Sequence, residues 1–129
     1  MTHDDDELLQ LTRRLLQSIL EGDWKTYAAI CDPTLTAFEP ESCGELVEGM
    51  EFHRFYFDRG GAAGPNNTTL CNPHVRRMGD TAVVSYVRLT QRLDDQGRPL
   101  TSRTEETRVY QRQQGTWRHV HFHRSGGGK

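Results

Sequence analysis

The segment 81–93 reads TAVVSYVRLTQRL, and its alternation decides how the rest of the chain is interpreted. Successive side chains of a strand point to opposite faces, so residues of one parity share a face. One face of this strand is expected to carry Ala82, Val84, Tyr86 and Arg88. Because its companions are apolar, this face should point into the core, and Arg88 should point there with it.

Three more strands are predicted on either side of this segment, over 68–78, 99–113 and 116–124, with turn sequences between them. Together the four form an antiparallel meander. The chain begins instead with leucines three or four residues apart, which predicts a helix over 5–21. Helices followed by strands indicate an α+β fold, in which a curved antiparallel sheet cradles the long N-terminal helix as a half-open cone.

The segments between this helix and the meander are shorter. Asp23 should cap a second helix that ends before Pro33, and 35–38 should form a short strand. Helical spacing resumes over 46–57, where Gly49 predicts a break into two short helical pieces. Glycines make 58–67 a mobile surface loop. The tail 126–129 is expected to be disordered or an expression remnant.

Composition narrows the classes of protein. With 129 residues and 34% hydrophobic content, the whole of 1–129 should form one domain. A net charge of −2 makes nucleic acid an unexpected partner, and no apolar run approaches the roughly 20 residues that cross a membrane. Three cysteines without a CxxC pair favour a reducing, cytoplasmic setting. The low mean hydropathy of −0.77 suggests that association between subunits supplies additional burial.

Buried arginines are the main chemical clue. Strand parity turns Arg88 and Arg124 toward the core, and Arg108 shares its parity with Glu106, so a third guanidinium can join them. An unpaired buried guanidinium is costly because it stays charged at any accessible pH. Two interpretations stay open. Either Glu106 or Glu105 neutralises one arginine while the others reach solvent along their aliphatic stems, or the arginines, with His53, bind a small carboxylate.

Histidines alternate along the last predicted strand. His119, His121 and His123 share a parity with Trp117 and are expected on its exposed face, opposite Val120 and Phe122. Such spacing can present two imidazoles to zinc, but a subunit contact is the favoured interpretation, and no metal or cofactor is expected. No nucleophile is tied to a base and an orienting acid, so enzymatic activity is the minority interpretation.

Two longer segments carry a resemblance to a known family. Residues 31–40, CDPTLTAFEP, and 46–57, LVEGMEFHRFYF, resemble the association, or hub, domain of calcium/calmodulin-dependent protein kinase II. The similarity continues through further segments, which are LCNPHV (70–75), RLTQ (88–91), EETRV (105–109) and VHFHRSG (120–126). It covers nearly the whole chain, from about Glu7 to Gly126.

The resemblance implies a fold similar to nuclear transport factor 2 and self-association into a closed, stacked double ring of identical subunits, roughly a dodecamer or larger. It also implies a small-carboxylate pocket, with residues that match His53, Arg88, Arg108 and Arg124 here. The nearly bare loop 58–65 departs from the family, which puts ligand gating by that loop in doubt.

Kinase motifs are missing, so no phosphorylation is expected from this chain alone. It can be a free-standing hub or an excised one, and kinase subunits that bear homologous hubs are further expected partners. An isomerase- or dehydratase-like enzyme, or a ligand sensor, on the same cone stays open as an alternative.

Overall fold

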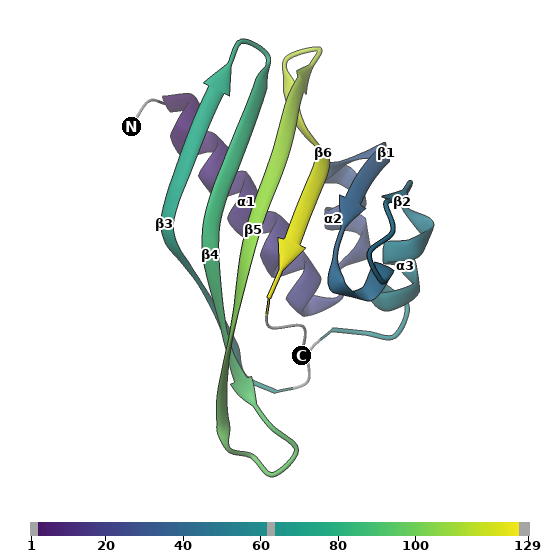
Figure 1. Ribbon diagram of the computed structural model, residues 1–129, viewed down its shortest axis with the longest axis vertical. Helices are drawn as coiled ribbons and strands as arrows, with labels where there is room; N and C mark the ends of the chain where they lie inside the picture. The colour runs from purple at the N-terminus through teal and green to yellow at the C-terminus, as the bar shows by residue number, and fades with distance from the viewer. Residues whose placement is uncertain (1–2, 62–63, 127–129) are drawn as a thin grey trace.

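A long helix, α1 (His3–Glu21), lies across the inner face of a six-stranded sheet (Figure 1). The computed structural model describes residues 3–61 and 64–126. The expected helix over 5–21 is confirmed, and it begins two residues earlier. No helix among the described residues is long and apolar enough to cross a membrane. Of the tail 126–129, only Gly126 is among the described residues.

The strands follow the spatial order β2-β1-β6-β5-β4-β3. The meander consists of β3 (Asn66–Met78), β4 (Thr81–Leu93), β5 (Pro99–Gln113) and β6 (Thr116–Ser125), all antiparallel as predicted. Before it come α2 (Trp24–Ile30), β1 (Cys31–Phe38), the 3-10 turn η1 (Pro40–Ser42), β2 (Val47–Glu48) and α3 (Glu51–Phe57). Because β1 runs parallel to β6, the sheet is mixed and not wholly antiparallel.

The prediction of two helical pieces over 46–57 was wrong in its first half. Residues before Gly49 form the edge strand β2, which pairs with β1 through Ala37↔Val47. Gly49 adopts φ +87°, and its amide donates to the Leu35 carbonyl at 2.7 Å. Pairing with an open sheet edge therefore outweighs the helical spacing of the side chains. Only the second half is helical, as α3.

A bulge in β6 overturns the predicted parity of the last strand. Val109 pairs with His121 and Tyr110 pairs with His119, so Val120 is an extra residue without a partner on β5. Residues before the bulge change face: Trp117 and His119 are buried inside the cone. His121 and His123 stay outside. The three histidines therefore do not share one exposed face, and Val120 is not an inward partner of Phe122.

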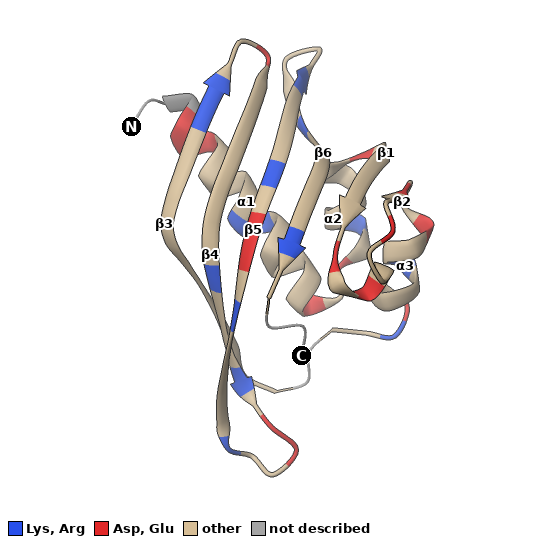
Figure 2. Cartoon of the chain, viewed as in Figure 1, with Lys and Arg blue, Asp and Glu red and all other residues tan. Residues whose placement is uncertain are grey.

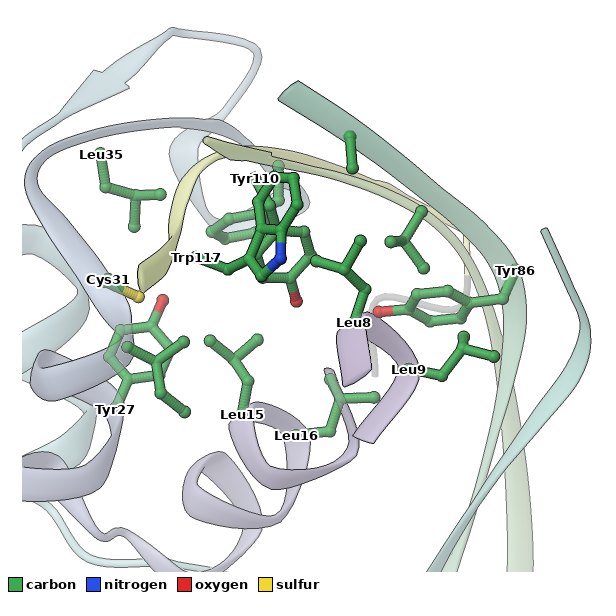
Figure 3. Packing of buried hydrophobic residues seen from close by; sticks show 14 of the residues in the cluster. Leu8, Leu9, Leu15, Leu16, Tyr27, Cys31, Leu35, Tyr86, Tyr110 and Trp117 are labelled. Atoms are coloured by element: carbon green, nitrogen blue, oxygen red, sulfur yellow. The ribbon is translucent and has the colours of Figure 1, made fainter. Parts of the chain in front are cut away.

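The core forms between α1 and the inner face of the sheet. Figure 3 shows Leu8, Leu15 and Leu16 of α1 directed toward Tyr110 and Trp117. Within this layer the Thr12 hydroxyl and Tyr110 Oη are hydrogen-bonded at 2.7 Å, which satisfies two buried polar groups. Polar side chains gather farther along the cone, beside α3 and the end of α1, where the candidate site lies.

Candidate functional site

Cross-strand register brings the arginines of three strands together. One row of facing residues is Val84, Arg108 and Phe122, and the next row is Tyr86, Glu106 and Arg124. Arg88 follows one position farther along the inner face of β4. They surround a cavity of about 280 Å³, which is lined by Ile19, Tyr27, Glu39, Glu41, His53, Tyr56, Phe57, Arg88, Arg108, Phe122 and Arg124. All four predicted site residues therefore lie on one cavity.

Arg108 is the deepest of the three arginines, with only 1% of its surface exposed. Its Nε donates to Tyr86 Oη at 2.7 Å, and its Nη2 donates to Glu106 Oε1 at 3.1 Å. The guanidinium also lies over the Phe122 ring, 4.6 Å from the centroid. Burial opposes the charge, but Tyr86 and Glu106 outweigh it and hold the pKa of Arg108 well above its ordinary value.

Glu106 is the counter-ion shared by two arginines. Its side chain is fully buried, and Arg88 Nε lies 2.8 Å from its Oε2 in an ion pair without hydrogen-bond alignment. Thr104 Oγ1 donates to the same oxygen at 2.9 Å, and Tyr86 Oη donates to Oε1 at 2.7 Å. Burial alone would raise the pKa of Glu106, but Arg108 and Arg88 lower it to about 2. Figure 2 shows this acidic segment of β5 between basic segments of β4 and β6.

Arg124 lies closer to solvent and contacts different carboxylates. Its Nη2 donates to Glu41 Oε1 and lies 3.5 Å from Glu39 Oε1. Burial would raise the pKa of Glu41, but its hydrogen bond to Arg124 and the guanidinium charge lower it. Sequence reasoning missed both glutamates, because they flank Pro40 after the end of β1, where strand parity no longer applies. Their presence on both sides of a strand-ending proline was the available signal.

His53 comes from α3 and is 5% exposed. Its Nδ1 lies 3.3 Å from Glu39 Oε2, and no described residue hydrogen-bonds to its buried Nε2. Burial, with a further contribution from Arg108, lowers the pKa of His53 to about 4. The imidazole is therefore neutral near pH 7, and the cavity gains no positive charge from it.

Three guanidiniums and the carboxylates of Glu39 and Glu41 line the cavity, and the buried carboxylate of Glu106 lies behind them, paired with Arg88 and Arg108. Of the two interpretations of the sequence, neutralisation of an arginine by a glutamate therefore applies to much of the site. Glu106 is the neutralising residue, and it pairs with both Arg88 and Arg108. Glu105, the other residue considered, lies outside and pairs with Arg103 at 3.3 Å. A ligand carboxylate would enter a site whose arginines already contact carboxylates of the protein.

A buried cysteine and histidine lie behind the arginines. Cys31 Sγ and His119 Nδ1 are 3.4 Å apart, and His119 Nε2 is 3.3 Å from Arg108 Nη1. Because a guanidinium can only donate, Nε2 is the acceptor and Nδ1 carries the proton. Burial raises the pKa of Cys31 to about 12, so the thiol stays protonated. The pair supports Arg108 and does not form an activated nucleophile.

The family of calcium/calmodulin dependent protein kinase II association domains matches residues 4–128. This chain belongs to that family. The delta subunit of calcium/calmodulin-dependent protein kinase type II from Oryctolagus cuniculus is 51% identical over 123 residues, which are 93% of this chain. The same residues are 23% of that relative, so the association domain here spans about a quarter of the length of the curated relative.

Solved association domains have the same fold. The association domain of the C. elegans kinase is 46% identical, with a TM-score of 0.90 and 95% of each chain covered. The hub homology domain from Chlamydomonas reinhardtii is also 46% identical, with a TM-score of 0.88, over 95% of this chain and 98% of that one. A putative dehydratase of the NTF2-like family from Streptomyces avermitilis is 20% identical over 95% of each chain, with a TM-score of 0.77, which shows a shared fold alone. The predicted α+β, nuclear transport factor 2-like fold is confirmed.

Proposed function

We propose that this association domain is a scaffold whose identical subunits close into a stacked double ring, roughly a dodecamer or larger. The observation that carries the proposal is the family match over residues 4–128. A lateral contact that repeats with a fixed rotation closes into a ring when the rotation returns to its start. Kinase subunits with homologous hubs and a cytoplasmic location are further predictions of the same proposal.

Two surfaces are suited to contacts between subunits. Figure 1 views the sheet from the face that the described helices leave uncovered, where Val83, Val109 and His121 form one facing row. The second surface is the outside of α3, where Phe55 is 52% exposed beside Tyr56 at 43%. Burying these side chains between copies would remove apolar area from water, which supports association.

Native mass spectrometry at micromolar concentration tests the ring. We expect one large symmetric species, and Phe55→Asp should shift the population toward smaller species because it places a charge in an apolar contact. Leu93→Asp, at the distal hairpin, is the matched control and should leave the mass unchanged. A wild-type protein that is monomeric or dimeric at this concentration contradicts the proposal.

We also propose that the cavity binds a small carboxylate through His53, Arg88, Arg108 and Arg124. Three guanidiniums beside the apolar walls of Phe122 and Phe57 suit an anionic head with a short apolar tail. Butyrate should raise the melting temperature, because a ligand that binds the folded state stabilises it. Arg124→Ala should abolish the shift and Arg103→Ala, on the exposed side of β5, should preserve it. A shift that survives Arg124→Ala overturns the pocket assignment.

A further inference from the structure

The carboxylates around the cavity differ in their freedom to move. The Glu106 side chain is 0% exposed and is enclosed by two arginines, a tyrosine and a threonine. The Glu41 side chain is 36% exposed and contacts Arg124, whose side chain is 15% exposed. Glu106 is therefore a fixed part of the site, whereas Glu41 lies where water can replace its contact.

Glu41 contacts the cavity arginine that is most exposed to solvent. Arg124 is the most exposed of the three cavity arginines, so an entering carboxylate meets it first. Arg124 Nη2 already contacts Glu41 and Glu39. A third carboxylate on this guanidinium would be repelled by two like charges at short range. One resident carboxylate has to leave, and the more exposed Glu41 is the one that can.

We propose that Glu41 is an internal competitor that pairs with Arg124 and swings into solvent when a carboxylate ligand binds. This inference rests on the proposed carboxylate pocket and identifies the residue that sets its affinity. Glu41 thereby makes binding selective, because the carboxylate of a ligand only replaces the interaction that Glu41 already makes with Arg124. The ligand gains net affinity from contacts of its tail with apolar walls such as Phe57 and Phe122.

The local backbone confines this movement to the side chain. Ser42, next to Glu41, is buried, and both its amide and its hydroxyl donate to the Glu39 carbonyl, at 3.0 Å and 2.8 Å. These bonds fix η1 on the side that faces the protein. Glu41 itself lies on the exposed side, so a change of rotamer carries its carboxylate into water without breaking the turn.

Titration calorimetry with butyrate, on the full-length assembled protein, tests the competition. Glu41→Gln and Glu41→Ala should bind butyrate about tenfold more tightly than the wild type, because a charge-assisted contact no longer has to be broken. Glu45→Gln, exposed on the same segment, is the matched control and should bind as the wild type does. Native mass spectrometry of each variant should show the same number of subunits as in the wild type.

The outcomes separate this inference from the proposed pocket. If the wild type binds butyrate, Arg124→Ala does not, and both Glu41 variants bind no more tightly than the wild type, the competitor role is wrong and the pocket stands. If neither the wild type nor the Glu41 variants bind butyrate, the pocket itself is wrong and the competitor role with it.

A spectroscopic measurement follows the movement directly. Cys43 is exposed, and its Sγ lies 3.9 Å from the Glu41 carbonyl oxygen, so a trifluoromethyl tag there senses the Glu41 environment. In a Cys71→Ser background, saturating butyrate should shift the fluorine resonance of the protein with wild-type Glu41. The shift should be reduced in Glu41→Gln, which has no ion pair to release. An unchanged resonance at saturating butyrate overturns the inference.

Discussion

Glu106 and Arg108, two residues apart on β5, form an ion pair of 3.1 Å whose side chains are 0% and 2% exposed. Alternation places both on the inner face of the strand, where neither charge can reach water. Such a pair gains little over a well-packed apolar pair, because the cost of removing two charges from water offsets their attraction. Substituting only one of the two residues is strongly destabilising, because the charge of the other residue then stays buried without a partner.

Glu106→Gln should therefore be strongly destabilising. Two guanidiniums, those of Arg88 and Arg108, would lose their shared counter-ion, and we expect a loss of about 3–5 kcal/mol in the free energy of unfolding. Urea denaturation at a fixed protomer concentration measures it. Glu105→Gln, whose side chain is 62% exposed, should change stability by less than about 0.5 kcal/mol. Equal effects of the two substitutions would contradict the buried network.

Features of the site that depend on patterns within one segment can be predicted from the sequence, whereas features that depend on contacts between distant segments cannot. Strand alternation is local, and it correctly directed Arg88, Arg108 and Arg124 inward. The fold class followed from equally local signals, the leucine spacing of α1 and the turns of the meander. These elements need only the residues of one segment to be recognised.

The features that sequence reasoning missed all depend on contacts between distant segments. The Val120 bulge reverses the face of His119, and it appears only in the pairing of β6 with β5. The edge strand β2 exists only because β1 offers it unpaired backbone groups. Glu41 reaches Arg124 across a separation of 83 residues. None of these three features is predicted by the spacing of apolar and polar residues within a single segment.

Acid should weaken the protein as the buried imidazole of His53 takes up a proton. The pKa of His53 falls from 6.5 in the unfolded chain to about 4 in the folded protein, so folding favours the neutral imidazole. Its contribution to stability is complete above pH 6.5 and is lost as the pH falls toward 4, by up to about 3 kcal/mol. Burial lowers the pKa of His119 as well, which acts in the same direction.

Urea denaturation across pH 4 to 7 measures this dependence, and His53→Gln should flatten it. A neutral amide of similar size cannot take up a proton in this range, so the difference between wild type and variant isolates the contribution of His53. A slope that is the same in both proteins would show that the imidazole is not held neutral by its burial.

The three thiols should react with Ellman's reagent in separate phases at pH 8. Cys43 is exposed and should react first, Cys71 is partly exposed and should follow, and Cys31 should react only after unfolding. Burial raises the pKa of Cys31 to about 12, which leaves almost no thiolate to attack the reagent. Cys43→Ser should remove the fastest phase alone. Three thiols reacting in folded protein would contradict the burial of Cys31.

Gly61 should not tolerate a side chain, because the loop after α3 packs its backbone against the end of α1. A Cβ at Gly61 would lie 2.4 Å from the Leu20 carbonyl oxygen and 2.5 Å from the Glu21 carbonyl carbon. Neither backbone atom can move without disturbing the last turn of the helix. We expect Gly61→Ala to lower the free energy of unfolding by about 1–3 kcal/mol, measured by urea denaturation.

Gly60→Ala is the matched control for that substitution. Gly60 adopts φ +86°, but a Cβ there meets no atom of the described residues within 4 Å, so its substitution should cost only the backbone strain of about 1 kcal/mol. The φ of Gly61 is not positive, so the destabilisation by Gly61→Ala should come only from the clash of the new Cβ with the backbone of α1. If Gly61→Ala proves no more destabilising than Gly60→Ala, the loop does not press against α1 in solution, and the end of the cone beside the cavity is looser than the packing of α1 implies.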